Sequence, residues 1–139
     1  MVKKVLRNKG KQFGYEKQLS EERKVMTKGL NIQPDVLWIK RDKLKVIFEI
    51  DTFSRGDYQK TIFGSMLSGI VFAKIKNAKF IEIVPRGDKN SKKAKLIAKL
   101  FKKYFHRTIY VIEVPRNQRY RHMQYNLTKE LKRNHIIPK

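Results

Sequence analysis

The chain has 139 residues, 40% of them hydrophobic, and its 34 Lys and Arg outnumber 12 Asp and Glu to give a formal net charge of +22. This length suits a single domain with its own core, and the absence of cysteine excludes disulfides, thiolate zinc sites and a cysteine nucleophile. So large a positive charge indicates a polyanionic partner, and we expect nucleic acid rather than an anionic membrane surface.

The sequence also predicts where the protein resides. Its longest uncharged stretch, Thr61 to Ala73, is shorter than the roughly 20 apolar residues that a membrane span needs. No apolar signal region follows the basic N-terminus. We therefore expect a cytoplasmic protein with no membrane partner.

The first third of the chain predicts an arm, a helix and a hairpin within one domain over 1–139. Residues 1–14 are basic and interrupted by glycine, so we expect a mobile arm. Ser20 can cap a short helix that ends near Lys28, with acidic residues in its first turn. Two apolar segments on either side of a polar turn then predict adjacent antiparallel strands at 36–40 and 44–51.

Helices and strands alternate over most of the remaining chain. In order, we expect a helix at 58–76, a strand at 79–84, a helix at 91–105 and a strand at 108–114. Residues 115–139 are polar and basic, which predicts an extension with one weak helix near 127–133. This order predicts an α/β (or α+β) fold with a central mixed sheet of about four strands flanked by helices.

The two long predicted helices each carry apolar side chains at helical spacing. On the first, these are Phe63, Met66, Leu67, Ile70, Val71 and Ala73. On the second, they are Leu96, Ile97, Leu100, Phe101 and Tyr104. We expect these residues to pack on the sheet, while Gly64, Ser65, Ser68 and Gly69 leave a subunit interface open as an alternative for the first helix.

The strand at 44–51 places acidic residues on one of its two faces. Leu44, Val46, Phe48 and Ile50 alternate along it and form an apolar face that we expect to be buried. Glu49 and Asp51 share the other face, about 6.6 Å apart along the strand. Asp35 precedes the neighbouring strand, so pairing of the two strands as a hairpin brings all three carboxylates to one end.

Carboxylates held this close repel one another unless a cation is present. Mg²⁺ prefers hard oxygen ligands, so we predict that Asp35, Glu49 and Asp51 hold Mg²⁺ or Mn²⁺. The alternative is that Glu49 and Asp51 pair with basic side chains on a solvated face. The distribution favours the metal site, because five of the twelve acidic residues fall between Asp35 and Asp57.

Two residues at the start of the following helix complete this predicted site. Lys60 lies about one turn into the helix and could point back at the strand end to position or activate water. Gln59 beside it could contact water or phosphate.

Pro34 and Asp35, followed after a hairpin by Glu49-Ile50-Asp51 in an apolar strand and then by a helix, resemble the PD-(D/E)XK nuclease superfamily. The resemblance extends over roughly 20–84. It implies a restriction-endonuclease-like core and Mg²⁺-dependent cleavage of a phosphodiester, with Asp35 and Glu49 as metal ligands.

The sequence departs from the superfamily at Asp51, which stands where the motif has lysine. Either Asp51 is an additional ligand and Lys60 replaces the lysine, or the site is inactive. The superfamily helix before the motif often adds a glutamate, and Glu22, Glu21 and Glu16 are the candidates.

Basic residues dominate the last part of the chain, where 89–139 hold 15 Lys and Arg but two acids, Glu113 and Glu130. The helix at 91–105 carries a lysine row that we expect to follow a phosphate backbone, unless it is simply a solvated face. The row consists of Lys92, Lys95, Lys99 and Lys102. Beyond it, Arg116, Arg119 and Arg121 alternate with Tyr120, His122 and Tyr125, which suits phosphate contacts and base stacking but also a disordered basic tail.

These observations favour a Mg²⁺-dependent endonuclease that acts on DNA. We expect a homodimer, because two chains with one site each provide the simplest way to cut two strands. A catalytically inactive nucleic-acid-binding protein with the same fold is the alternative. A basic component of a ribonucleoprotein is a third possibility.

Overall fold

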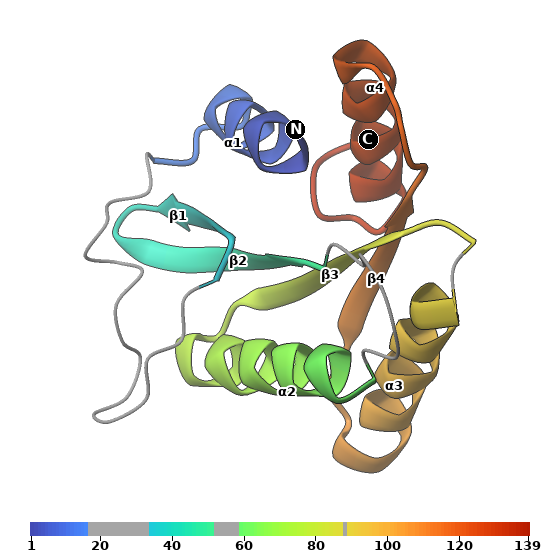
Figure 1. Ribbon diagram of the computed structural model, residues 1–139. Coiled ribbons are helices and arrows are strands. Elements are labelled where there is room, and N and C mark those ends of the chain that lie inside the picture. The colour runs from blue at the N-terminus through green and yellow to red at the C-terminus, as the bar shows by residue number, and fades with distance from the viewer. Residues whose placement is uncertain (17–33, 52–58, 88) are drawn as a thin grey trace.

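The computed structural model describes residues 1–16, 34–51, 59–87 and 89–139. These residues form an α/β structure of three layers, in which a sheet lies between two pairs of helices (Figure 1). The helix predicted at 20–28 and the loop predicted at 52–57 lie outside the described residues.

The sheet is mixed, and its four strands lie in the order β1-β2-β3-β4. β1 (Val36–Lys40) pairs antiparallel with β2 (Lys43–Ile50). β3 (Lys79–Pro85) and β4 (Ile109–Val114) follow parallel to β2. The predicted mixed sheet of four strands is therefore confirmed, with strand ends that differ from the predicted ones by no more than a residue.

Parallel pairing brings the carboxyl ends of β2, β3 and β4 to one edge of the sheet. β1 runs the opposite way, so it begins at that edge. Asp35 before β1, Asp51 after β2 and Arg86 after β3 therefore lie along the same edge, where α/β proteins commonly bind ligands.

Two helices cover each face of the sheet (Figure 1). α2 (Gln59–Lys76) and α3 (Lys89–Phe105) pack on one face, and their bounds match the predicted helices closely. α1 (Val2–Gln12) and α4 (Tyr120–Arg133) pack on the other. In the described part of the chain, no helix combines the length and the apolar composition that crossing a bilayer requires.

The prediction of a mobile arm at 1–14 is wrong, because α1 occupies most of that segment. Val5 and Leu6 of this helix are 1% and 0% exposed. The Trp38 indole donates a hydrogen bond to the Leu6 carbonyl oxygen at 3.0 Å. A Cβ at Gly10 would lie 2.7 Å from the Trp38 ring nitrogen, so the glycine permits close packing here rather than flexibility.

The C-terminal segment also belongs to the core rather than to an extension. The weak helix predicted near 127–133 is the second half of α4, whose buried residues are Met123, Leu127 and Leu131. Ile136 and Ile137 follow the helix and are buried as well. These side chains complete the hydrophobic cluster between α1, α4 and the sheet.

The middle of β2 is buried on both faces, because helices cover both. Val46 and Phe48 pack toward α1 and α4, as expected, whereas Ile47 packs toward α2 and α3. Leu44 does not share the face of Val46 as predicted. The strand register shifts between Trp38 and Ile39, which moves Leu44 to the cluster on the α2 side.

Several apolar residues that were expected to pack on the sheet are exposed instead. On α2, Met66, Ile70 and Ala73 are buried, and on α3 so are Ile97 and Phe101. We name the exposed apolar residues of these two helices the α2–α3 surface: Phe63, Leu67, Val71, Ile75, Leu96, Leu100, Tyr104 and Phe105. The two helices meet where the rings of Phe63 and Phe101 lie 6.1 Å apart.

Candidate functional site

The predicted acidic residues lie together where β1 begins and β2 ends. The strand register pairs Val36 with Phe48, which places Asp35 opposite Glu49. The Ile50 amide donates a hydrogen bond to Asp35 Oδ2 at 2.7 Å. The side chains of Glu49 and Asp35 are themselves hydrogen-bonded.

Asp51 follows β2 directly and lies on the same face as Glu49. Its amide donates a hydrogen bond to the Ile83 carbonyl oxygen at 3.0 Å, which ties it to β3. The Ser65 hydroxyl of α2 donates to its carboxylate. Asp51 Oδ2 is buried and has no hydrogen-bond partner among the described residues.

Burial and the neighbouring carboxylates make Glu49 and Asp51 weaker acids than usual. Burial, followed by the charge and hydrogen bond of Asp35 and the charge of Asp51, raises the pKa of Glu49 to about 9. Burial also raises the pKa of Asp51 to about 6, against the opposing hydrogen bond from Ser65. A divalent cation would relieve this repulsion, because it favours the ionised form of each group.

Lys3 also belongs to the site, although no local sequence pattern pointed to it. Its Nζ lies 3.2 Å from Asp35 Oδ1, and its charge acts to lower the pKa of Glu49. Lys3 is in α1, the segment expected to be a mobile arm, so only the packing of α1 on the sheet brings it here. The predicted residues Gln59 and Lys60 lie in the first turn of α2, but their side chains are outside the described part of the structure.

The additional glutamates expected near the motif do not enlarge this cluster. Glu22 and Glu21 lie outside the described residues. Glu16 lies at the far end of β1, where its amide donates to the Ile39 carbonyl oxygen and its side chain accepts a hydrogen bond from the Arg41 amide. It is therefore separated from Asp35 by the length of the strand.

The carboxyl pair of Asp35 and Glu49 suits Mg²⁺, which commonly binds one or two carboxylates and completes its shell with waters and substrate phosphates. Asp51 Oδ2, which is buried and has no partner among the residues described, adds a third carboxyl group at the same edge. Among the residues that the structure describes, no three Asp, Glu, His or Cys side chains are already arranged around one ion position. Asp35 and Glu49 would therefore hold the ion, with Asp51 next to them.

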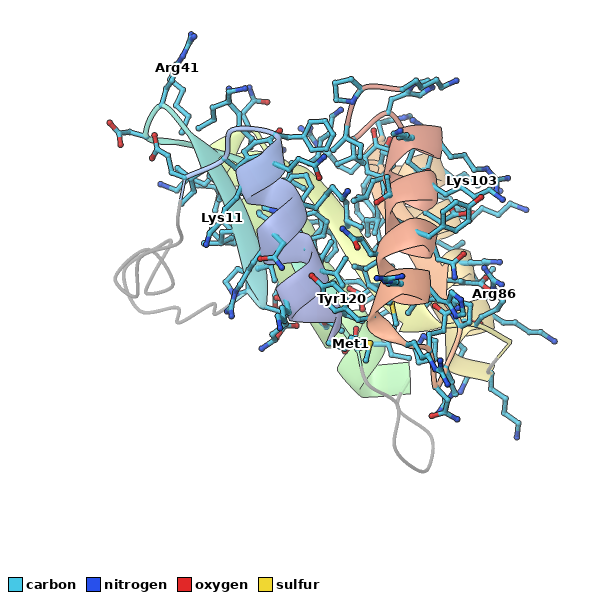
Figure 2. The ribbon with its side chains drawn as sticks, turned by 90° about the horizontal axis from the view of Figure 1, so that it is seen from above. Met1, Lys11, Arg41, Arg86, Lys103 and Tyr120 are labelled. Atoms are coloured by element: carbon cyan, nitrogen blue, oxygen red, sulfur yellow. The ribbon has the colours of Figure 1, made fainter. Side chains whose placement is uncertain are left out.

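The predicted basic residues are exposed but form two surfaces rather than one. Lys92, Lys95, Lys99 and Lys102 lie on α3, in the layer below the sheet. Arg116 and Arg119 lie between β4 and α4, and Arg121 is in the first turn of α4, in the opposite layer. Figure 2 shows labelled basic side chains at widely separated places on the molecule, with Arg41 at one end and Arg86 and Lys103 at the other.

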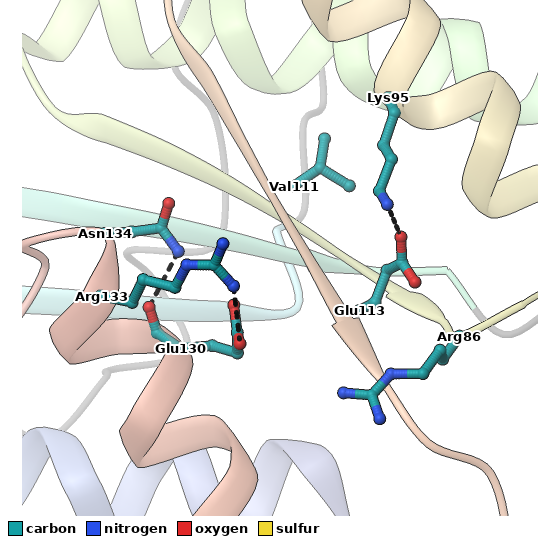
Figure 3. A pocket seen from close by; sticks show the side chains of 7 residues that line it. All are labelled: Arg86, Lys95, Val111, Glu113, Glu130, Arg133 and Asn134. Carbon is teal, nitrogen blue, oxygen red and sulfur yellow. Dashed lines mark hydrogen bonds and ion pairs between the residues drawn. The ribbon is translucent and has the colours of Figure 1, made fainter.

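A polar cavity of about 360 Å³ lies along β4, the outer strand of the sheet on the side away from β1, and Arg86 at the carboxyl end of β3 forms part of its lining. It is lined by Arg86, Lys95, Val111, Glu113, Glu130, Arg133 and Asn134 (Figure 3). Lys95 pairs with Glu113, and Arg133 approaches Glu130 at 3.8 Å. Among the described residues, no side chain pairs with the guanidinium of Arg86, which leaves it available to an anion.

The raised pKa of Glu49 predicts how stability depends on pH without divalent cations. The folded state keeps a proton up to about pH 9, whereas the unfolded chain releases it near its ordinary pKa of 4.5. The contribution of Glu49 is thus fully present at low pH and is lost as pH rises through this window. Relative to Glu49→Gln, we expect the wild-type free energy of unfolding to fall by up to about 1.4 kcal/mol per pH unit.

Urea unfolding from about pH 5 to about pH 9, with a chelator present, measures this difference. Gln can keep a hydrogen bond to Asp35 but does not titrate, so ionisations distant from the site cancel between the two proteins. Parallel stability curves would show that Glu49 ionises normally.

Comparisons with protein family models, with curated proteins and with solved structures give no match. The function is therefore inferred from the chemistry of the site.

Proposed function

We propose that the protein is a metal-dependent endonuclease that hydrolyses phosphodiester bonds of DNA. The observation that carries this proposal is the hydrogen-bonded pair Asp35–Glu49, a partly buried carboxyl pair in a chain with a net charge of +22. Asp35, Glu49 and Asp51 would hold Mg²⁺ or Mn²⁺. Such an ion supplies Lewis-acid chemistry and activates water.

Lys3 supports this site through Asp35. Asp51 occupies the place where the PD-(D/E)XK motif has lysine, so the site needs its positive charge from elsewhere. The Lys3 ammonium contacts Asp35 and holds this carboxylate in place. Lys60 remains a second candidate because α2 begins next to the acidic residues.

Basic residues along the carboxyl ends of the strands would hold the DNA. Arg86 follows β3, the strand next to β2, so it lies on the same edge as Asp51, and it also lines the cavity beside β4. Neighbouring strands are about 4.8 Å apart, so β4 lies roughly 10 Å from β2, and the cavity lies on the outer side of β4. A DNA strand along this edge would present one phosphate to the acidic residues and another to Arg86.

The α2–α3 surface would form the dimer contact. It exposes large apolar side chains, and the helix α2 carries no charge from Thr61 to Ala73. A helix that is apolar on all sides generally has both sides covered. Gly64 has no atom within 4 Å of an added Cβ, so a second helix can approach closely there.

The first prediction concerns cleavage. With Mg²⁺ or Mn²⁺, the wild type should cut at least one of supercoiled, linear, branched or single-stranded DNA. Glu49→Gln and Asp35→Asn should lower the rate by more than about 100-fold, since they alter the ion's own ligands. Lys3→Ala should lower it about 10- to 100-fold, and Lys3→Arg should restore most of it.

Lys60→Ala, measured beside Lys3→Ala, shows which lysine the reaction needs. Tight, salt-sensitive binding without metal-dependent cleavage would instead support the inactive nucleic-acid-binding protein, the reading favoured by Asp51 at the lysine position. Cleavage that survives both Asp35→Asn and Glu49→Gln would place the active site elsewhere.

A second prediction concerns DNA binding at the cavity. Without divalent ions, Arg86→Gln should weaken binding of a fluorescent duplex and lower the slope of log affinity against log salt by about 1, the loss expected for one phosphate contact. Arg107→Gln is the matched control, because Arg107 is exposed but precedes β4 at the opposite edge of the sheet. Equal effects of the two changes would mean that only net charge matters.

A third prediction concerns the oligomeric state. Leu67→Lys should convert the dimer into a monomer in light scattering after size exclusion at about 0.3 M salt, which screens the repulsion between basic chains. Tyr125→Lys makes the same type of change on α4 and should leave the dimer intact. A wild type that is monomeric under these conditions, with or without DNA, would contradict the proposed contact.

A further inference from the structure

Glu82 is a buried acid that the site described so far does not use. It lies in the middle of β3, is 0% exposed, and neither of its carboxyl oxygens has a hydrogen-bond partner among the described residues. The strand register pairs it with Glu49 of β2. Ile81 and Ile83 pack toward α1 and α4, so Glu82 and Glu49 lie side by side on the other face.

Protonation of Glu82 would not by itself explain how its buried carboxyl group is stabilised. A protonated carboxyl group still carries a donor and an acceptor, and each needs a partner when it is buried. Buried polar groups in proteins are nearly always hydrogen-bonded, so a carboxyl with two unpartnered oxygens requires an explanation. A bound cation is one partner that would satisfy both oxygens.

The unpartnered atoms are concentrated at one place. Within the described residues, the buried side-chain oxygens and nitrogens that lack a partner are Asp51 Oδ2 and both oxygens of Glu82. All three lie on the α2–α3 face of the sheet, where Glu82 of β3 pairs with Glu49 of β2 and Asp51 directly follows β2. This coincidence distinguishes Glu82 from an isolated buried acid.

We propose that Glu82 is a further ligand of the metal site and that, with Glu49 and Asp51, it binds a divalent cation on the inner side of the Asp35–Glu49 pair. This inference rests on the proposed function for the position of the first ion. Oxygen ligands of this type select hard cations such as Mg²⁺, Mn²⁺ or Ca²⁺. Because no three acidic groups are already converged in the described residues, Glu49 has to exchange its hydrogen bond to Asp35 for the ion.

Titration calorimetry with Mn²⁺ tests the assignment without any nucleic acid. Glu82→Gln should lower Mn²⁺ affinity by at least about tenfold and reduce the number of ions bound. Glu113→Gln is the matched control, because Glu113 lies on the next strand but is paired with Lys95. This control should bind Mn²⁺ like the wild type.

Thermal unfolding provides a second measurement. Mn²⁺ should raise the melting temperature of the wild type more than that of Glu82→Gln, whereas the metal-free Gln variant should be as stable as the wild type or more so. If Glu82→Gln does not fold, Glu82→Asp keeps the charge on a shorter side chain and should bind Mn²⁺ with intermediate affinity. Wild-type Mn²⁺ binding in both variants would overturn the inference.

The outcomes separate this inference from the nuclease proposal. Mn²⁺ binding that depends on Glu82 in a protein that cuts no DNA would support the ligand and contradict the nuclease. Metal-dependent cleavage together with unchanged Mn²⁺ binding in Glu82→Gln would support the nuclease and contradict the assignment of Glu82 as a ligand.

Discussion

The hydrogen bond from the Ile50 amide to Asp35 joins the beginning of β1 to the end of β2. Asp35 lies one residue before the last strand pair, Val36 with Phe48, so without this bond its side chain would be free to turn away from the sheet. Hydrogen bonds to a charged acceptor are among the stronger ones in proteins. Lys3 and Glu49 both contact the Asp35 carboxylate. The arrangement of the candidate site therefore depends on how Asp35 is held.

The many basic residues of the chain have little effect on the charge of the acidic residues at the candidate site. The exposed cations do little to neutralise them, because solvent and salt screen charges on the surface. Lys3 is the one described basic residue that lowers the pKa of Glu49, and burial outweighs it. One alternative was that Glu49 and Asp51 pair with basic side chains on a solvated face. Glu49 does not fit this alternative, because it is partly buried and hydrogen-bonded to Asp35.

Much of the fold followed from sequence patterns because these patterns are local. Alternation along 44–51 correctly placed Glu49 and Asp51 on one face, and helical spacing located α2 and α3. The errors arose where tertiary packing, rather than local sequence, determines the conformation of a segment or the face on which a residue lies. A basic, glycine-containing segment became α1 through its contact with Trp38, and a shift in register moved Leu44 to the other face.

The site residues that sequence patterns missed have the same explanation. Lys3 reaches Asp35 only because α1 packs on the sheet, and Glu82 meets Glu49 only through the register of two strands distant in sequence. Alternation in the strand at 79–84 does place Glu82 opposite Ile81 and Ile83. That signal becomes informative only when the pairing of β2 with β3 is known.

The buried acids bear directly on the choice between an enzyme and an inactive binding protein. Binding a phosphate backbone requires exposed cations, and acidic groups at the binding edge repel the same backbone. Glu82 and Glu49 also destabilise a metal-free fold, since apolar residues of similar volume would remove the desolvation cost of these groups. A divalent cation would offset both effects, because it would partner the buried oxygens and attract a phosphate to the same edge. The position of these acids is therefore better explained by metal-dependent phosphodiester chemistry than by binding alone.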